Sequence, residues 1–138
     1  MRYLGLDLGS KTLGVAVSDK TGLIASTYKT IRHDEEYDSL IDVVKNLVFE
    51  LEIDAIVLGF PKNMNNTIGP KGELSLEFKE KLEHVLDVPV YLQDERLSTK
   101  SATDILIASD VSRKNRKKVV DSMAASIILQ TYLDGRNS

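Results

Sequence analysis

The chain has 138 residues and a formal net charge of −3, with 42% hydrophobic and 28% charged residues. This length suits one domain with a substantial core. The net charge does not suggest nucleic-acid binding driven by bulk charge, so any such binding must come from local patches. Because there is no cysteine, disulfides and thiolate metal sites are excluded, and any metal would need oxygen or histidine ligands. The longest apolar run, residues 55–60, is far shorter than the about 20 residues that span a bilayer. No signal-peptide pattern opens the chain, so we expect a cytoplasmic protein that does not contact membranes.

The first third of the chain predicts three strands, at about 3–8, 12–18 and 23–31. The segments between them are short and turn-like, so an antiparallel meander is expected.

Helical and strand patterns alternate in the rest of the chain. A helix with apolar residues from Leu40 to Leu51 is expected first, followed by a buried strand at about 54–60 and a polar loop at about 62–72. A helix at about 74–85, a strand at about 88–93 and two final helices at about 98–108 and 116–133 are expected after them. A meander followed by βα crossovers predicts an α/β fold with a mixed five-stranded sheet and helices on both faces. No linker divides the chain, so residues 1–138 are expected to form a single domain.

Asp7 is an acid in the middle of a strand that is otherwise apolar. An unpaired charge in such a place costs several kcal/mol, so it is expected to meet a metal, a cation or a substrate, or to act as a structural hydrogen-bonding residue. Asp94 and Glu95 follow directly on the strand at 88–93 and reach the same sheet edge if the two strands are parallel. Alternation along the strand allows only one of these two acids to point into a shared site. Glu95 could also simply pair with Arg96 or with the basic segment at 113–118.

Asp121 is the third candidate acid. It lies on one face of the last predicted helix with small and apolar residues, which are Ala124, Ala125, Ile128 and Tyr132. That face is expected to pack on the sheet, although an ordinary surface pair with Lys117 is the alternative. Three converging carboxylates repel one another without a cation. Hard oxygen ligands favour Mg²⁺ or Mn²⁺, and such ions support phosphodiester hydrolysis.

Four blocks of the sequence resemble the YqgF family, also called RuvX. They are residues 5–19, 59–70, 94–99 and 118–125, and together they extend over nearly the whole chain. The resemblance implies an RNase H-like fold and a divalent-metal nuclease that matures the 5′ end of the 16S rRNA precursor or resolves Holliday junctions. The acids that it assigns to catalysis and to the metal are Asp7, Glu95 and Asp121.

A basic segment precedes Asp121, with five cations in residues 113–118. Its position beside the proposed metal site favours phosphate binding over a merely solvated face. The loop after the strand at 54–60 contains three Asn, which could bind sugar or phosphate or could serve as turn residues. The complete set of expected nucleic-acid contacts is Lys11, Lys62, Asn63, Arg96, Arg113, Lys114, Arg116, Lys117 and Lys118. His33 and His84 are predicted to be surface residues.

The expected partner is structured RNA, in the first place the rRNA precursor, with branched DNA as the alternative. An association with the ribosome would agree with an rRNA substrate. One rival function is nucleotide binding, because residues 7–11 also resemble the phosphate loop of actin, Hsp70 and sugar kinases. Those proteins clamp nucleotide between two such domains, and this chain supplies one. A second rival is a non-catalytic module that docks on ribosomal RNA. The sequence does not distinguish a monomer from a homodimer.

Overall fold

The computed structural model describes residues 1–61, 68–94 and 113–137, with side chains from 123 to 136 in the last range. The predicted helix at about 98–108 lies outside the described residues. The five strands are β1 (Tyr3–Leu8), β2 (Thr12–Ser18), β3 (Ala25–Arg32), β4 (Ala55–Phe60) and β5 (Val90–Asp94).

The strands form one mixed sheet in the order β3-β2-β1-β4-β5. The first three strands make an antiparallel meander, and β4 and β5 run parallel to β1. The predicted five-stranded architecture is therefore confirmed. β3 begins two residues later than expected because Leu23 and Ile24 donate their backbone N–H groups to the Asp19 carboxylate and so belong to the turn.

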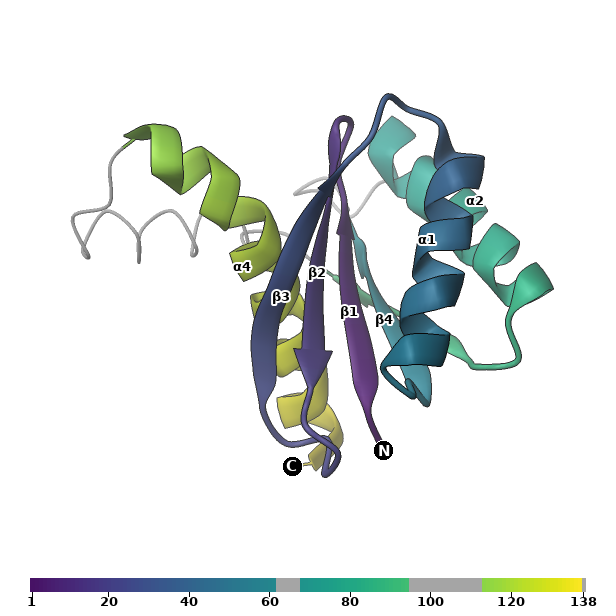
Figure 1. Ribbon diagram of the computed structural model, residues 1–138, viewed down its shortest axis with the longest axis vertical. Helices are drawn as coiled ribbons and strands as arrows, with labels where there is room; N and C mark the ends of the chain where they lie inside the picture. The colour runs from purple at the N-terminus through teal and green to yellow at the C-terminus, as the bar shows by residue number, and fades with distance from the viewer. Residues whose placement is uncertain (62–67, 95–112, 138) are drawn as a thin grey trace.

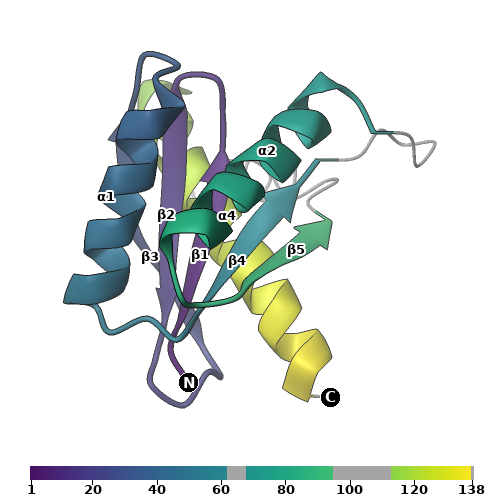
Figure 2. The same cartoon turned by 90° about the vertical axis from the view of Figure 1, so that its right-hand side faces the viewer.

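Three described helices cover the sheet, namely α1 (Tyr37–Glu50), α2 (Pro70–Val85) and α4 (Arg113–Asn137). Figures 1 and 2 show α1 and α2 on one face and α4 on the other. The end of the predicted loop at 62–72 was wrong, because α2 already begins at Pro70. Proline suits a first helical position, where a backbone N–H has no partner within the helix. α4 extends the predicted helix at both ends.

Strand alternation divides the core into two layers. Even-numbered residues of β1, such as Leu4 and Leu6, pack under α1 and α2, whereas Tyr3 packs under α4 with Ala125 and Leu129. Both ends of the chain lie at the edge of the sheet where β1 begins (Figure 1). Within the described parts of the chain, none of the helices has the length and apolar character that crossing a membrane requires.

Gly5 is where α4 comes closest to the sheet. A Cβ atom added to Gly5 would lie 2.8 Å from the Cβ of Leu129 and 3.1 Å from the carbonyl oxygen of Ala125. The small residues of α4 therefore do pack on the sheet as their pattern predicted, and glycine on β1 makes the close approach possible.

Candidate functional site

The carboxyl ends of the parallel strands meet at one edge of the sheet, which is the upper edge in Figure 1. Leu6 of β1 is level with Leu58 of β4, and Phe60 of β4 is level with Asp94 of β5. The end of β1 and the end of β5 therefore reach the same edge, as the sequence predicted. Asp7 lies there, half-buried, one residue before β1 ends.

The two faces of the sheet separate Asp7 from Asp94. Asp7 lies on the face of Tyr3 and Gly5, which is covered by α4. Asp94 is paired with Phe60, whose ring would contact a Cβ added to Gly72 of α2. Paired residues in a sheet point to the same side, so Asp94 points toward the α2 face. Tyr91 confirms this alternation, because its ring stacks on Tyr132 of α4 at a centroid distance of 5.6 Å.

Glycines flank Asp7 on both neighbouring strands. Gly14 of β2 is its register partner, and continuing the β1–β4 register by one residue places Gly59 on its other side. Neither neighbour puts a side chain beside the carboxylate on the α4 face. The sequence shows both glycines, but only the register shows that they lie next to Asp7.

Asp121 lies in the first half of α4, and its side chain is outside the described residues. The contacts of the second half of α4 indicate how far along β1 Asp121 lies. Tyr132 packs on Tyr3 with ring centroids 5.9 Å apart, and Ala125 packs on Gly5. One helical step of four residues covers about 6 Å, and one strand step of two residues covers about 6.6 Å. Asp121 comes four residues before Ala125 along α4, and Asp7 comes two residues after Gly5 along β1. Because these two steps are of nearly equal length, Asp121 lies at about the level of Asp7 along the strand.

The described residues contain only part of the predicted acid site. Glu95 lies outside them, and among the residues that are described no three His, Cys, Asp or Glu side chains are close enough to hold a metal. Of the predicted nucleic-acid contacts, Lys11 alone has a described side chain. It is exposed on the β1–β2 turn, with its Nζ 4.0 Å from Oε1 of Glu35. The contacts whose placement or side chains fall outside the described set are Lys62, Asn63, Arg96, Arg113, Lys114, Arg116, Lys117 and Lys118.

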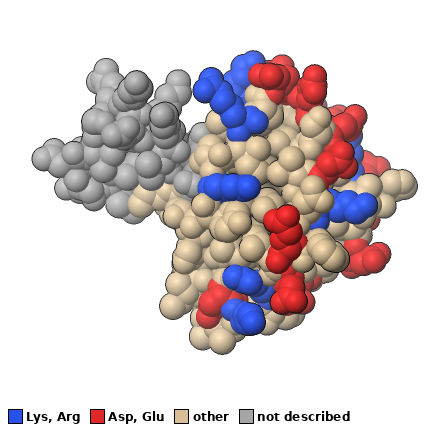
Figure 3. Space-filling model, in the orientation of Figure 1, with Lys and Arg blue, Asp and Glu red and all other residues tan. Residues whose placement is uncertain are grey.

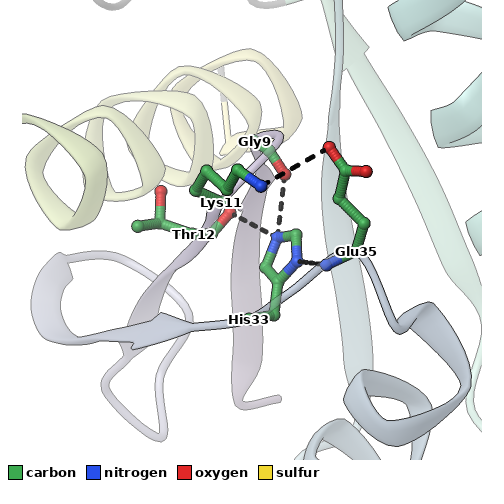
Figure 4. Close-up of polar contacts among 5 residues, drawn as sticks. All are labelled: Gly9, Lys11, Thr12, His33 and Glu35. Atoms are coloured by element: carbon green, nitrogen blue, oxygen red, sulfur yellow. Dashed lines mark hydrogen bonds and ion pairs between the residues drawn. The ribbon is translucent and has the colours of Figure 1, made fainter.

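His33 is a buried residue, so its prediction as a surface residue was wrong, whereas His84 is exposed as predicted. The Glu35 backbone N–H donates to His33 Nδ1 at 3.0 Å, which requires the ring proton to be on Nε2. Nε2 then donates to the carbonyl oxygen of Gly9 at 2.9 Å, with the carbonyl of Thr12 at 3.3 Å (Figure 4). The imidazole thus joins the turn after Asp7 to the segment that leads into α1. Local sequence gave no sign of this, because the acceptors lie more than twenty residues away.

The family model described as "RuvX: Holliday junction resolvase" matches residues 1–135. This chain belongs to the RuvX family. A RuvX relative from Bacillus licheniformis is 58% identical over 100% of both chains, and one from Bacillus subtilis is 56% identical over 99% of this chain and 100% of its own. Both are provisionally named as a pre-16S rRNA nuclease.

Among solved structures, the RuvX-family chain is similar in fold to Thermus thermophilus RuvC in complex with a Holliday junction substrate. The TM-score is 0.62 at 16% sequence identity, over 99% of this chain and 96% of the other. The RNase H-like fold expected from the sequence is thereby confirmed.

Proposed function

We propose that this protein is a nuclease that hydrolyses phosphodiester bonds of structured nucleic acid, and that its substrate is the 5′ end of the 16S rRNA precursor. Membership of the RuvX family and full-length relatives that carry a pre-16S rRNA nuclease name support the reaction and the substrate. The observation that carries the proposal is the position of Asp7. It lies half-buried at the carboxyl edge of the sheet, between two glycines, on the face that α4 covers. A nuclease that processes an rRNA precursor is expected to act in the cytoplasm.

We assign catalysis to Asp7, Glu95 and Asp121. The place of Asp121 on α4 supports it, because it comes four residues before Ala125, which packs on Gly5 of the strand that carries Asp7. Asp94 is the poorer alternative to Glu95, since Asp94 points to the opposite face of the sheet from Asp7.

The donor set fits Mg²⁺ or Mn²⁺. Carboxylate oxygens are hard ligands, the chain has no cysteine, and both ring nitrogens of His33 are already engaged by backbone groups. When bound, such an ion supplies the Lewis acidity that activates water and stabilises the leaving oxygen.

The residues of the chain hold and orient the substrate. Asp7 is fixed by a strand with neighbours on both sides, so its carboxylate keeps its place while the substrate binds. Lys11 and the cations of residues 113–118 contact phosphates at the same end of the sheet, and Lys62, Asn63 and Arg96 complete the contacts. Water is the nucleophile, so no protein nucleophile is required.

Holliday junction resolution is the second candidate. The description of the family and the fold shared with RuvC favour it. Resolution of a four-way junction needs two active sites related by a two-fold axis, whereas trimming of an RNA end needs one. A homodimer in solution would support the junction as substrate, and a monomer would support the RNA end.

The test offers the purified protein an rRNA precursor and a four-way DNA junction with Mn²⁺. Asp7→Asn is expected to slow cleavage by at least about a hundredfold, which corresponds to about 2.7 kcal/mol of transition-state stabilisation. Asp94→Asn is the matched control, because this acid ends a strand at the same edge but faces away, and it should cut at the parent rate. Cleavage by Asp7→Asn at the parent rate would contradict the assignment. Salt-sensitive RNA binding without any cleavage would instead indicate the non-catalytic docking module.

A further inference from the structure

Arg32 ends β3 at the same sheet edge as Asp7. The register pairs Arg32 with Thr12, and it pairs Asp7 with Gly14, which is level with Thr30. Residues 12, 14 and 16 of β2 share one face, and Ala16 belongs to the core under α4. Arg32 therefore lies on the same face as Asp7.

The spacing between Arg32 and Asp7 suits two phosphates of one strand. Two strand separations of about 4.8 Å and a shift of two residues along the strands place their Cα atoms about 12 Å apart. A duplex strand advances about 3.4 Å along the helix axis per phosphate. A strand with one phosphate at Asp7 can thus place another, a few nucleotides away, at Arg32.

Arg32 is available for such a contact. Its side chain is exposed, and within the described part of the chain it makes no hydrogen bond or ion pair. Lys11 lies on the adjacent turn, and the ion pair that it makes among the described residues is the long, exposed contact with Glu35, which contributes little. Figure 3 shows Lys and Arg side chains at the top of the molecule, directly beside acidic side chains.

His33 links the two cations. It is the next residue after Arg32, and its backbone N–H donates to the carbonyl oxygen of Lys11 at 2.9 Å. Its ring donates to Gly9 in the same turn (Figure 4). A buried residue with these bonds keeps the turn of Lys11 at a fixed place beside the end of β3.

We propose that Arg32 and Lys11 form a phosphate-binding pair that holds the nucleic-acid strand beside Asp7, with His33 as the positioning residue of this pair. The pair binds the sugar-phosphate backbone and reads no bases, because its two groups are cations, and contacts of cations with phosphate carry no sequence information. The proposal rests on the nuclease function proposed above. It adds the path of the substrate strand, which runs from Asp7 toward Arg32 and Lys11.

The test measures binding of a fluorescein-labelled RNA hairpin with a single-stranded 5′ extension, by fluorescence anisotropy, without divalent metal and over a range of salt concentrations. Arg32→Gln is expected to raise Kd and to reduce the slope of log Kd against log salt by about 0.7 to 0.9, which is the loss of one phosphate contact. Lys29→Gln is the matched control. It removes an exposed cation from the same strand, but Lys29 is paired with Val15 and lies on the opposite face, so slope and Kd should stay at the parent values.

His33 is tested by a double-mutant cycle. Lys11→Gln should weaken binding in the parent but add little to His33→Ala, because the turn is no longer held. His33→Gln keeps an N–H donor for Gly9 and should restore part of the contribution of Lys11. Thermal melts establish that each variant is folded.

Three results would overturn the proposal or part of it. Parent-like binding by Arg32→Gln, or an equal loss with Lys29→Gln, would exclude a specific phosphate contact at Arg32. A full contribution of Lys11 in the His33→Ala background would exclude the positioning role. If Arg32 is required for binding but the parent never cleaves RNA or DNA with metal, the phosphate-binding pair stands and the proposed nuclease function fails.

Discussion

Gly5→Ala tests whether the contact between β1 and α4 holds the candidate site together. The new Cβ would lie 2.8 Å from Leu129 Cβ and 3.1 Å from the Ala125 carbonyl oxygen. Carbon atoms normally pack about 3.5–4.0 Å apart, so α4 or β1 must shift by roughly 1 Å. The atoms that would have to move are a helix backbone and a Cβ, which cannot rotate away. Overpacking of this kind costs about 1–3 kcal/mol, a large part of the about 5–15 kcal/mol that stabilises a typical domain.

Urea denaturation followed by circular dichroism measures this loss directly. Gly135→Ala is the matched control, because a Cβ at that position of α4 would meet no atom within 4 Å. It should leave stability unchanged or raise it by up to about 1 kcal/mol, since alanine favours the helix more than glycine does.

The same shift has a consequence for cleavage. It moves the half of α4 that carries Asp121 relative to Asp7, so the rate of cleavage by Gly5→Ala should fall even at temperatures where the variant is fully folded. A Gly5→Ala protein that is as stable as the parent would refute the close packing. One that is destabilised but cleaves at the full rate would refute the dependence of the site on α4.

Two further predictions concern the other end of the sheet. Asp19 accepts hydrogen bonds from the Thr21 hydroxyl and then from the Ile24 and Leu23 N–H groups, which lower its pKa from 3.8 to about 2. The stabilisation that follows is therefore present above pH 3.8 and is lost as pH falls through about 2. Melting temperatures of the parent and Asp19→Asn should differ at pH 6 and converge near pH 2; a constant difference would contradict the linkage. Ser18→Ala should cost about 1–3 kcal/mol in urea denaturation, because the buried Tyr3 N–H loses its acceptor, the Ser18 Oγ at 2.7 Å. Ser26→Ala, on exposed β3, should cost almost nothing, and an equal loss in both variants would argue against the buried bond.

Local patterns predicted the elements of the fold well. The strand at 3–8 and the strand at 12–18 were predicted with the bounds that the structure has, because apolar runs and short turns are visible within a few residues. The apolar face of α4 was visible for the same reason. The errors lie at the ends of elements, where a side chain such as Asp19 captures backbone groups and decides where a strand starts.

The sequence by itself determined the chemistry that this protein has available. It placed an acid within an apolar strand, excluded thiolate ligands, and concentrated cations near a second acid. Tertiary structure alone decided which groups share a surface. Strand register placed Asp94 and Asp7 on opposite faces and Arg32 on the face of Asp7, and a long-range contact buried His33. The physical reason is that periodicity describes each element separately, whereas register and burial depend on hydrogen bonds and packing between segments distant in the chain.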